Sequence, residues 1–230
     1  GLVGSEMCIR DRNSEQEAFM RRIIDRCQQE ARDLTGSFKN SEPLRDCLLG
    51  FPGTGKSTCI NTVRDFFEQV LHWEKSVQFQ FLASQNTMAA LIDGPTVHSW
   101  GGIPVGTEMA FQKSTSKEAE GDIDQLFLNA ISMRFLLLDE VSTMSPTLLG
   151  LLDNYLRRAC QRHPYAKRGD HTRPFGGINV IFCGDFWQLP PVKAISIFGN
   201  PFKIQNSKKS SYTFEEQRIL NMFWNYEDID

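Results

Sequence analysis

The chain has 230 residues, of which 40% are hydrophobic and 23% charged, and its formal net charge is -3. This composition is typical of a globular protein with one large or two small domains, and the charge argues against a surface covered by nucleic acid. No run of about 18 apolar residues is present, so no membrane-spanning helix is expected. The six cysteines include no Cys-x-x-Cys pair, which argues against a zinc ribbon and favours a reducing compartment.

Residues 1–12 contain the stretch LVGSEMCIRDR, which lacks the continuous apolar centre of a signal peptide. The stretch resembles one reading frame of the transposase adapter used in sequencing libraries. We therefore expect residues 1–12 to be adapter-derived, or an engineered tag, and exclude them from the fold. On this expectation the natural protein continues upstream and the chain is a fragment.

Helix-like and strand-like segments alternate along the rest of the chain. Apolar residues at helical spacing predict a first helix over residues 14–34, capped by Asn13 or Ser14. A polar stretch at 104–121 predicts a surface excursion. Further helices are expected at 55–71, 87–92, 122–132 and 145–160, and strands at 44–49, 77–83, 134–140 and 177–185.

The predicted strands are near-continuous apolar runs that alternate with helices. This pattern favours an α/β fold in which a mostly parallel sheet has helices on both faces. Ligands of such sheets bind at the carboxyl ends of the strands. The unusual residue clusters of this sequence all follow predicted strands, so we expect a single site at that edge.

The sequence GFPGTGKS at residues 50–57 matches the pattern G-x-x-x-x-G-K-[ST] between a strand and a helix. Glycines allow backbone N–H groups to approach phosphate oxygens closely, and the following helix directs its positive end to the same place. Lys56 supplies a cation for the outer phosphates, and Ser57 a hydroxyl ligand for Mg²⁺. The pattern predicts ATP and Mg²⁺ as cofactors; the nucleotide-contacting residues are Gly53, Thr54, Gly55, Lys56, Ser57 and Thr58.

Two further motifs lie at the ends of predicted strands. In LLLDEVS, Asp139 is expected to hold Mg²⁺ and Glu140 to act as the general base toward water. In GDFWQLPPV, Gln188 is a neutral hydrogen-bonding group that can sense the γ-phosphate, and the prolines after it stiffen the segment. Lys56, Asp139, Glu140 and Gln188 are therefore the predicted catalytic residues, with Ser57 and Asp139 at the metal.

These motifs, together with GPTVHSWGGI, resemble consecutive motifs of the Pif-type DNA helicases, in the RecD-like branch of helicase superfamily one. The resemblance covers residues 13–203 and implies a RecA-like P-loop NTPase domain, followed by a truncated exit segment at 204–230. It implies an ATP-dependent DNA helicase, an ATP hydrolase moving 5′ to 3′ on single-stranded DNA, with roles in DNA repair, recombination and telomere maintenance. The sequence departs from the family at Gln85-Asn86, where a Thr-Gly-like pair is usual.

The resemblance also implies roles for residues outside the ATP motifs. Gln16 corresponds to the position that reads the adenine edge. Thr96, His98, Ser99 and Phe186 lie where the family contacts DNA. Trp100 and Phe186 are candidates for base stacking, with packing in the core as the alternative for each.

The family also implies single-stranded DNA and DNA junctions as partners, and no membrane is expected to bind. It further implies a second RecA-like domain of the same chain, which supplies an arginine finger. Because this domain is absent, we expect the fragment not to unwind DNA alone. Another P-loop ATPase, an RNA-directed motor and a nucleotide-dependent binding module remain alternatives. The expected location is intracellular: nucleus or mitochondrion in a eukaryote, cytoplasm in a bacterium.

A basic stretch between residues 157 and 173 has two interpretations. Its charges suit contact with a phosphate backbone, but they also suit a solvated helix end and loop. Cys160 and His163 have no second pair of metal ligands nearby, so a metal site is not expected there. The stretch contains Arg157, Arg158, Arg162, Lys167, Arg168 and Arg173, opposed by Asp170.

Overall fold

The computed structural model of the chain describes residues 14–33, 41–104, 118–185, 187, 190–191, 194–198 and 213–224. The predictions made for residues 1–13 lie outside these ranges, as does most of the excursion predicted at 104–121. None of the helices within the described ranges combines the length and the apolar character that crossing a lipid bilayer requires.

The centre of the fold is a sheet of four parallel strands in the order β1-β6-β3-β2. The prediction of a parallel sheet is therefore confirmed. Pairing of Leu49 with Gly184 and of Ala83 with Asp139 brings the carboxyl ends of the strands to one edge. The strands are β1 (Arg45–Leu49), β2 (Phe79–Ala83), β3 (Phe135–Asp139) and β6 (Asn179–Gly184).

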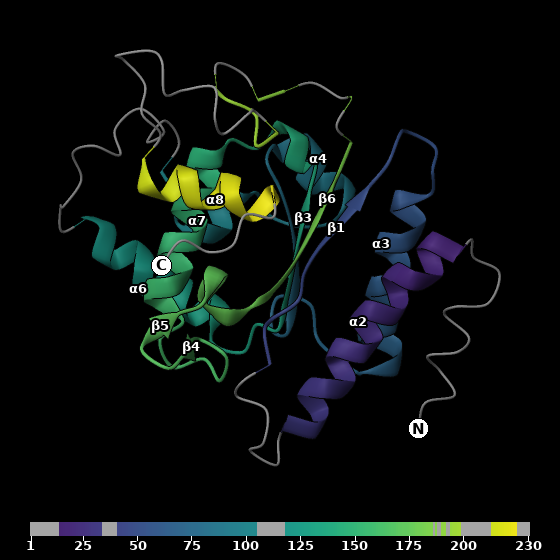
Figure 1. The fold of residues 1–230 in the computed structure, drawn as a ribbon, viewed down its shortest axis with the longest axis horizontal. Coiled ribbons are helices and arrows are strands. Elements are labelled where there is room, and N and C mark those ends of the chain that lie inside the picture. Colours follow the sequence, from purple (N-terminus) through teal and green to yellow (C-terminus); the bar gives the residue numbers. More distant parts are fainter. Residues whose placement is uncertain are drawn as a thin grey trace.

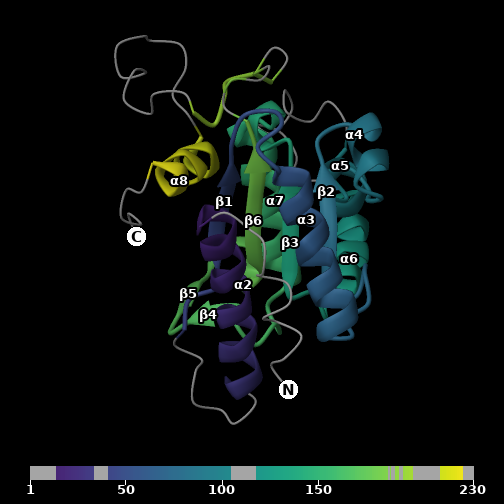
Figure 2. The same ribbon diagram turned by 90° about the vertical axis from the view of Figure 1, so that its right-hand side faces the viewer.

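Helices cover both faces of the sheet, as predicted (Figure 1, Figure 2). Alternate residues of β3 point to opposite sides: Phe135 and Leu137 belong to one core cluster, and Leu136 and Leu138 to the other. The first face carries α2 (Ser14–Asp33), α3 (Lys56–Asp65) and α4 (Asn86–Leu91). The second carries α5 (Val97–Gly101), α6 (Glu118–Ala130), α7 (Pro146–Ala159) and α8 (Phe214–Phe223).

The helix predicted at 55–71 is the α-helix α3 followed by a π-helical turn, η1 (Phe66–Val70). Phe66 and Phe67 in this turn are both buried. The ring of Phe67 lies 5.1 Å from that of Phe79 and 5.0 Å from that of Phe135. The periodicity of apolar residues predicted the buried face, but it does not distinguish an α turn from a π turn.

Short elements join the longer ones. The 3₁₀ turn η3 (Val141–Thr143) follows β3, and the 3₁₀ turn η4 (Pro174–Gly177) precedes β6. A small antiparallel hairpin of β4 (Lys167–Arg168) and β5 (His171–Thr172), which was not predicted, lies between α7 and β6. Its polar two-residue strands lack the apolar alternation by which strands are recognised.

A buried ionic network fastens α2 to the amino edge of the sheet. Glu30 Oε1 accepts hydrogen bonds from Arg26 Nε (3.1 Å) and Asn179 Nδ2 (2.7 Å). Glu30 Oε2 accepts from Arg134 Nε (2.9 Å) and from Nη2 of the same side chain (2.6 Å). Only 4% of Glu30 is exposed. The network fixes α2 along the sheet, and the first turn of α2 consequently lies beside the loop that follows β1.

Candidate active site

The loop between β1 and α3 has the backbone that a phosphate-binding loop requires. Gly53 and Gly55 have φ values of 79° and 86°, a left-handed conformation that glycine adopts without steric cost. Gly50 N donates to Gly184 O at 3.3 Å, which joins the loop to the end of β6. Lys56 Nζ donates to Phe51 O at 3.0 Å and also to Gly50 O, so its ammonium lies against the loop backbone.

Gln16 at the start of α2 contacts this loop directly. Its Nε2 donates to Thr54 O at 3.3 Å. A Cβ atom added to Gly55 would lie 2.7 Å from the same Nε2. The structure therefore places Gln16 next to the phosphate loop, while its role toward adenine stays a prediction.

Asp139 and Glu140 lie beside Lys56 at the end of β3. Burial raises the pKa of Asp139, and the Glu140 N–H and the Lys56 charge oppose this rise. Burial, followed by the charge of Asp139, raises the pKa of Glu140, again opposed by Lys56. Two adjacent carboxylates beside one ammonium form the electrostatic environment predicted for a metal-holding acid and a general base.

A third carboxylate, Asp185, joins this group from the end of β6. Asp185 is 2% exposed, and its charge contributes to the raised pKa of Glu140. Its Oδ1 accepts from Trp187 N at 3.0 Å. Among the described residues, Oδ2 of Asp185 and Oε2 of Glu140 are buried without a hydrogen-bond partner. Buried carboxylate oxygens normally have partners, so this edge is suited to a ligand that supplies them.

The donor set suits Mg²⁺ better than a metal held by protein side chains alone. Among the residues that the structure describes, no three His, Cys, Asp or Glu side chains form a metal-binding group. Mg²⁺ in nucleotide sites is typically held by one or two protein oxygens together with phosphates and water. The Asp139 carboxylate and the exposed Ser57 hydroxyl agree with that requirement.

Two hydroxyl groups that hold the backbone of Glu140 were not predicted from the sequence. Glu140 has a left-handed backbone (φ 53°), which is uncommon for a residue with a side chain. Thr143 donates to Glu140 O through Oγ1 at 2.7 Å and through its N–H at 2.9 Å. Because that hydroxyl proton is used, Ser84 Oγ, 2.5 Å away at the end of β2, must donate to Thr143 Oγ1. No local sequence pattern connects Ser84 with Thr143.

The predicted catalytic Gln188 and the predicted DNA contact Phe186 lie outside the described residues. Trp187 between them is described and is 81% exposed. Its ring is stacked on Phe51 of the phosphate loop, with the centroids 6.1 Å apart. The segment after β6 therefore contacts the phosphate loop through a pair of exposed aromatic rings.

The TVHS segment forms the start of α5, next to the end of β2. Thr96 pairs with Ala83 and caps α5, accepting from Ser99 N at 3.1 Å. Ser99 is exposed and His98 half-buried, so the structure leaves both accessible at this edge. Trp100 is 7% exposed and belongs to the core, which decides between stacking and core packing for this residue.

The chain matches the family model for PIF1-like helicases over residues 13–228. It is 31% identical over 143 residues to "ATP-dependent DNA helicase RRM3" of Saccharomyces cerevisiae, covering 62% of this chain and 18% of the relative. It is 34% identical over 145 residues to "ATP-dependent DNA helicase PIF1" of Homo sapiens, covering 63% of this chain and 20% of the relative. The chain thus spans about a fifth of the length of these curated relatives.

Solved structures agree with this similarity. A Pif1 helicase from Bacteroides, in complex with ADP-AlF3 and ssDNA, matches with a TM-score of 0.52 and 26% identity, covering 78% of this chain and 33% of that one. The Pif1 helicase of Candida albicans matches with a TM-score of 0.51 and 24% identity, which supports the fold alone. The central parallel sheet with helices on both faces is accordingly a RecA-like α/β domain.

Proposed function

Because the chain belongs to the PIF1-like helicase family, we propose that it is the first motor domain of an ATP-dependent DNA helicase, which couples ATP hydrolysis to movement along single-stranded DNA. The observation that carries this proposal is the meeting of Lys56, Asp139, Glu140 and Asp185 with the glycine loop at one edge of the sheet. The Bacteroides relative is described in complex with ADP-AlF3 and ssDNA, which supports the same cofactor and substrate.

In this proposal each residue acts on ATP through the geometry described above. The backbone N–H groups of the loop and the Lys56 ammonium bind the outer phosphates. Ser57 and Asp139 would hold Mg²⁺, which supplies positive charge to the phosphates when it is bound. Glu140 accepts a proton from the attacking water, and its raised pKa brings it closer to the operating pH of a general base. Ser84 and Thr143 keep the Glu140 backbone in position.

We propose Thr96, His98 and Ser99 as contacts for the sugar–phosphate backbone, and Gln188 as the sensor of the γ-phosphate. We also propose the 5′-to-3′ direction and roles in repair, recombination and telomere maintenance. The opposite wall of the ATP cleft would come from a second RecA-like domain, so the 230-residue chain alone is expected to bind ATP without unwinding DNA. We propose an intracellular location, which would be the nucleus or mitochondrion in a eukaryote and the cytoplasm in a bacterium.

The nucleotide site is tested by titrating the chain with a fluorescent ATP analogue and Mg²⁺. Lys56→Ala should weaken binding at least tenfold, because it removes the cation of the loop. The control Lys75→Ala removes a lysine that pairs with Asp93 away from the site, and it should bind as wild type does. Equal affinity of Lys56→Ala and wild type would refute the nucleotide site.

The nucleic-acid substrate is tested by the rate of ATP hydrolysis with oligonucleotides of equal length. Stimulation by single-stranded DNA supports the DNA helicase. Stimulation by RNA alone would favour the RNA-directed motor instead. Strand separation by the 230-residue chain would contradict the expected need for a second domain.

A further inference from the structure

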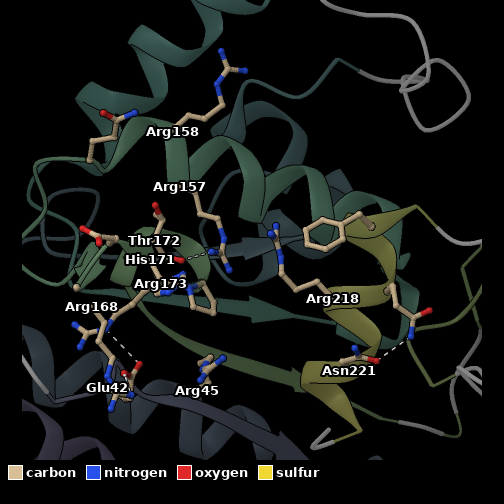
Figure 3. Close-up of a pocket in the computed structure, with 16 residues that line it drawn as sticks. Glu42, Arg45, Arg157, Arg158, Arg168, His171, Thr172, Arg173, Arg218 and Asn221 are labelled. Carbon is tan, nitrogen blue, oxygen red and sulfur yellow. Dashed lines mark hydrogen bonds and ion pairs between the residues drawn. The ribbon is translucent and has the colours of Figure 1, made fainter. Parts of the chain in front are cut away.

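The structure contains a large cleft, separate from the phosphate loop and lined by several arginines (Figure 3). Its volume is about 1110 Å³, and its walls come from the start of β1, the end of α7, the β4–β5 hairpin and α8. Arg45 in this cleft is the first residue of β1, whereas the phosphate loop follows the last. A nucleotide in the phosphate loop therefore cannot be the ligand of this cleft.

The cleft concentrates positive charge on a chain whose net charge is -3. Two carboxylate side chains, Glu42 and Asp170, also line it. Part of the predicted basic stretch thus meets arginines from two distant elements, which the sequence did not indicate. The lining arginines are Arg45, Arg157, Arg158, Arg168, Arg173 and Arg218.

The floor of the cleft is built around one buried carboxylate. Asp153 is 1% exposed and accepts from Arg157 Nε at 3.0 Å and from Arg218 Nη2. Arg173, which is 3% exposed, donates to Tyr165 O at 3.3 Å and pairs with Glu42 at 3.4 Å. Two carboxylates, Asp153 and Glu42, thus face three guanidinium groups, which leaves an excess of positive charge in fixed positions.

The rim carries guanidinium groups that an anion can reach. Arg45, Arg158 and Arg168 are exposed. Arg168 pairs with Glu42 at 3.1 Å, but its side chain is 67% exposed, and exposed ion pairs contribute only about 0–1 kcal/mol. This pair is therefore readily exchanged for a stronger contact with a phosphate, for which the guanidinium fork is suited.

An exposed aromatic ring lies among these charges. Phe214 at the start of α8 lines the cleft and is 69% exposed. The guanidinium carbon of Arg218 lies 5.5 Å from the centroid of its ring. Guanidinium groups that track a backbone, combined with a ring on which a base can stack, are the features of sites for single-stranded nucleic acids.

We propose that this cleft binds a segment of single-stranded nucleic acid, through its phosphates on the rim arginines and through one base on Phe214. The contact would be independent of sequence, because charged contacts to phosphates carry no base information. This inference rests on the proposed function in one respect: a DNA helicase has single-stranded DNA available to occupy a second site. The site is separate from Thr96, His98 and Ser99, which lie at the carboxyl edge of the sheet.

The test compares two triple variants of the full chain that carry the same net charge. Binding of a fluorescein-labelled 15-nucleotide oligothymidine is measured by anisotropy at several salt concentrations, without nucleotide. The cleft variant should bind at least tenfold more weakly, and its salt slope should be shallower by about 2, since each lost single-strand phosphate contact contributes about 0.7. The cleft variant is Arg45→Gln/Arg158→Gln/Arg168→Gln, and the control is Arg21→Gln/Arg22→Gln/Lys75→Gln, which should stay within twofold of wild type.

Phe214→Ala provides an independent measurement, because it changes no charge. It should weaken binding at least fivefold, with an unchanged salt slope. Equal weakening by both triple variants would reduce the effect to general electrostatics and overturn the inference. Displacement of the oligonucleotide by tripolyphosphate, together with an inert Phe214→Ala, would assign the cleft to a small polyphosphate and overturn it as well.

Failure of this inference can be told apart from failure of the proposed function. The cleft variant leaves Lys56 and Glu140 intact, so it should bind the ATP analogue as wild type does. Unchanged oligonucleotide binding by the cleft variant, with weaker binding by Ser99→Ala, would remove the second site and leave the helicase proposal standing. Loss of nucleotide binding in Lys56→Ala is a property of the other edge and does not depend on the cleft.

Discussion

Replacement of Glu140 with glutamine is expected to stabilise the folded chain while it removes the proposed general base. Within the described residues, Glu140 Oε2 is buried without a hydrogen-bond partner. Burial and the charge of Asp139 raise the pKa of Glu140. The folded state therefore disfavours the charged form of Glu140, and the glutamine side chain removes that charge while keeping the shape of the side chain.

The direction of the pH dependence follows from the raised pKa. A carboxyl group with a higher pKa in the folded chain binds its proton more tightly there than in the unfolded chain. Its stabilising contribution is therefore complete below the unfolded pKa of about 4.3. This contribution is lost as the pH rises through the folded pKa. As the pH rises, deprotonation of the wild-type side chain places a negative charge in this position and destabilises the folded chain. An unsatisfied buried polar group costs about 1–3 kcal/mol, and the partial exposure of Glu140 reduces that cost. We therefore expect Glu140→Gln to raise the free energy of unfolding by about 0.5–1.5 kcal/mol at pH 8.

Urea unfolding of the 230-residue chain, followed by circular dichroism at pH 8 and at about pH 5 without Mg²⁺ or nucleotide, measures this gain. The gain should be smaller at the lower pH. Glu17→Gln, which removes an exposed partner of Arg21, is the control and should change the stability by less than about 1 kcal/mol. ATP hydrolysis should fall by about 10²–10⁴-fold with nucleotide binding retained. A less stable Glu140→Gln at pH 8, or an equal gain at both pH values, would refute the reasoning.

Glu30→Gln should destabilise the chain by about 3–5 kcal/mol in the same urea assay, because it leaves the guanidinium groups that pair with Glu30 uncompensated. A loss of stability as small as that of Glu17→Gln would show that the buried ionic network does not fix α2 to the sheet. Thr143→Val should cost about 1–3 kcal/mol through its two hydroxyl hydrogen bonds, and a Thr143→Ser variant that is equally destabilised would show that the hydroxyl is not responsible. Gly55→Ala should weaken binding of the ATP analogue about tenfold, because Gly55 has a φ of 86° and the added methyl group meets the Gln16 amide at the start of α2. The matched control is Gly169→Ala, at a glycine with a φ of 60° and open space around it, and it should leave nucleotide affinity unchanged. Similar losses of affinity in both variants would argue against a local effect.

The sequence predicted those parts of the fold that depend on local pattern. The parallel sheet followed from apolar runs between helices, and the phosphate loop from a motif that is contiguous in the chain. Asp139 and Glu140 could be placed at the sheet edge because the strand before them is strongly apolar. The contact of Ser84 with Thr143 could not be predicted, since these residues are 59 positions apart and pair only through the order of the strands.

The sequence also could not assign residues with two plausible environments. Trp100 fits base stacking and core packing equally well as a residue type, and only the packing of α5 against the sheet decided for the core. The basic stretch similarly fitted a solvated face and a phosphate contact. Its arginines gained a common cleft only through Arg45 and Arg218, which come from other elements.

The two edges of the sheet differ in how their buried carboxylates are paired. At the amino edge, both oxygens of Glu30 are satisfied by neighbouring donors, so that group has no capacity left for a ligand. At the carboxyl edge, Glu140 and Asp185 each keep a buried oxygen for which the described residues provide no partner. The sequence pointed to Glu140 because it follows an apolar strand, but it gave no indication of how many donors surround the oxygens of these acids. The number of protein donors per oxygen separates them, and this number predicts opposite effects of the same Glu→Gln change: a large loss of stability at Glu30 and a gain at Glu140.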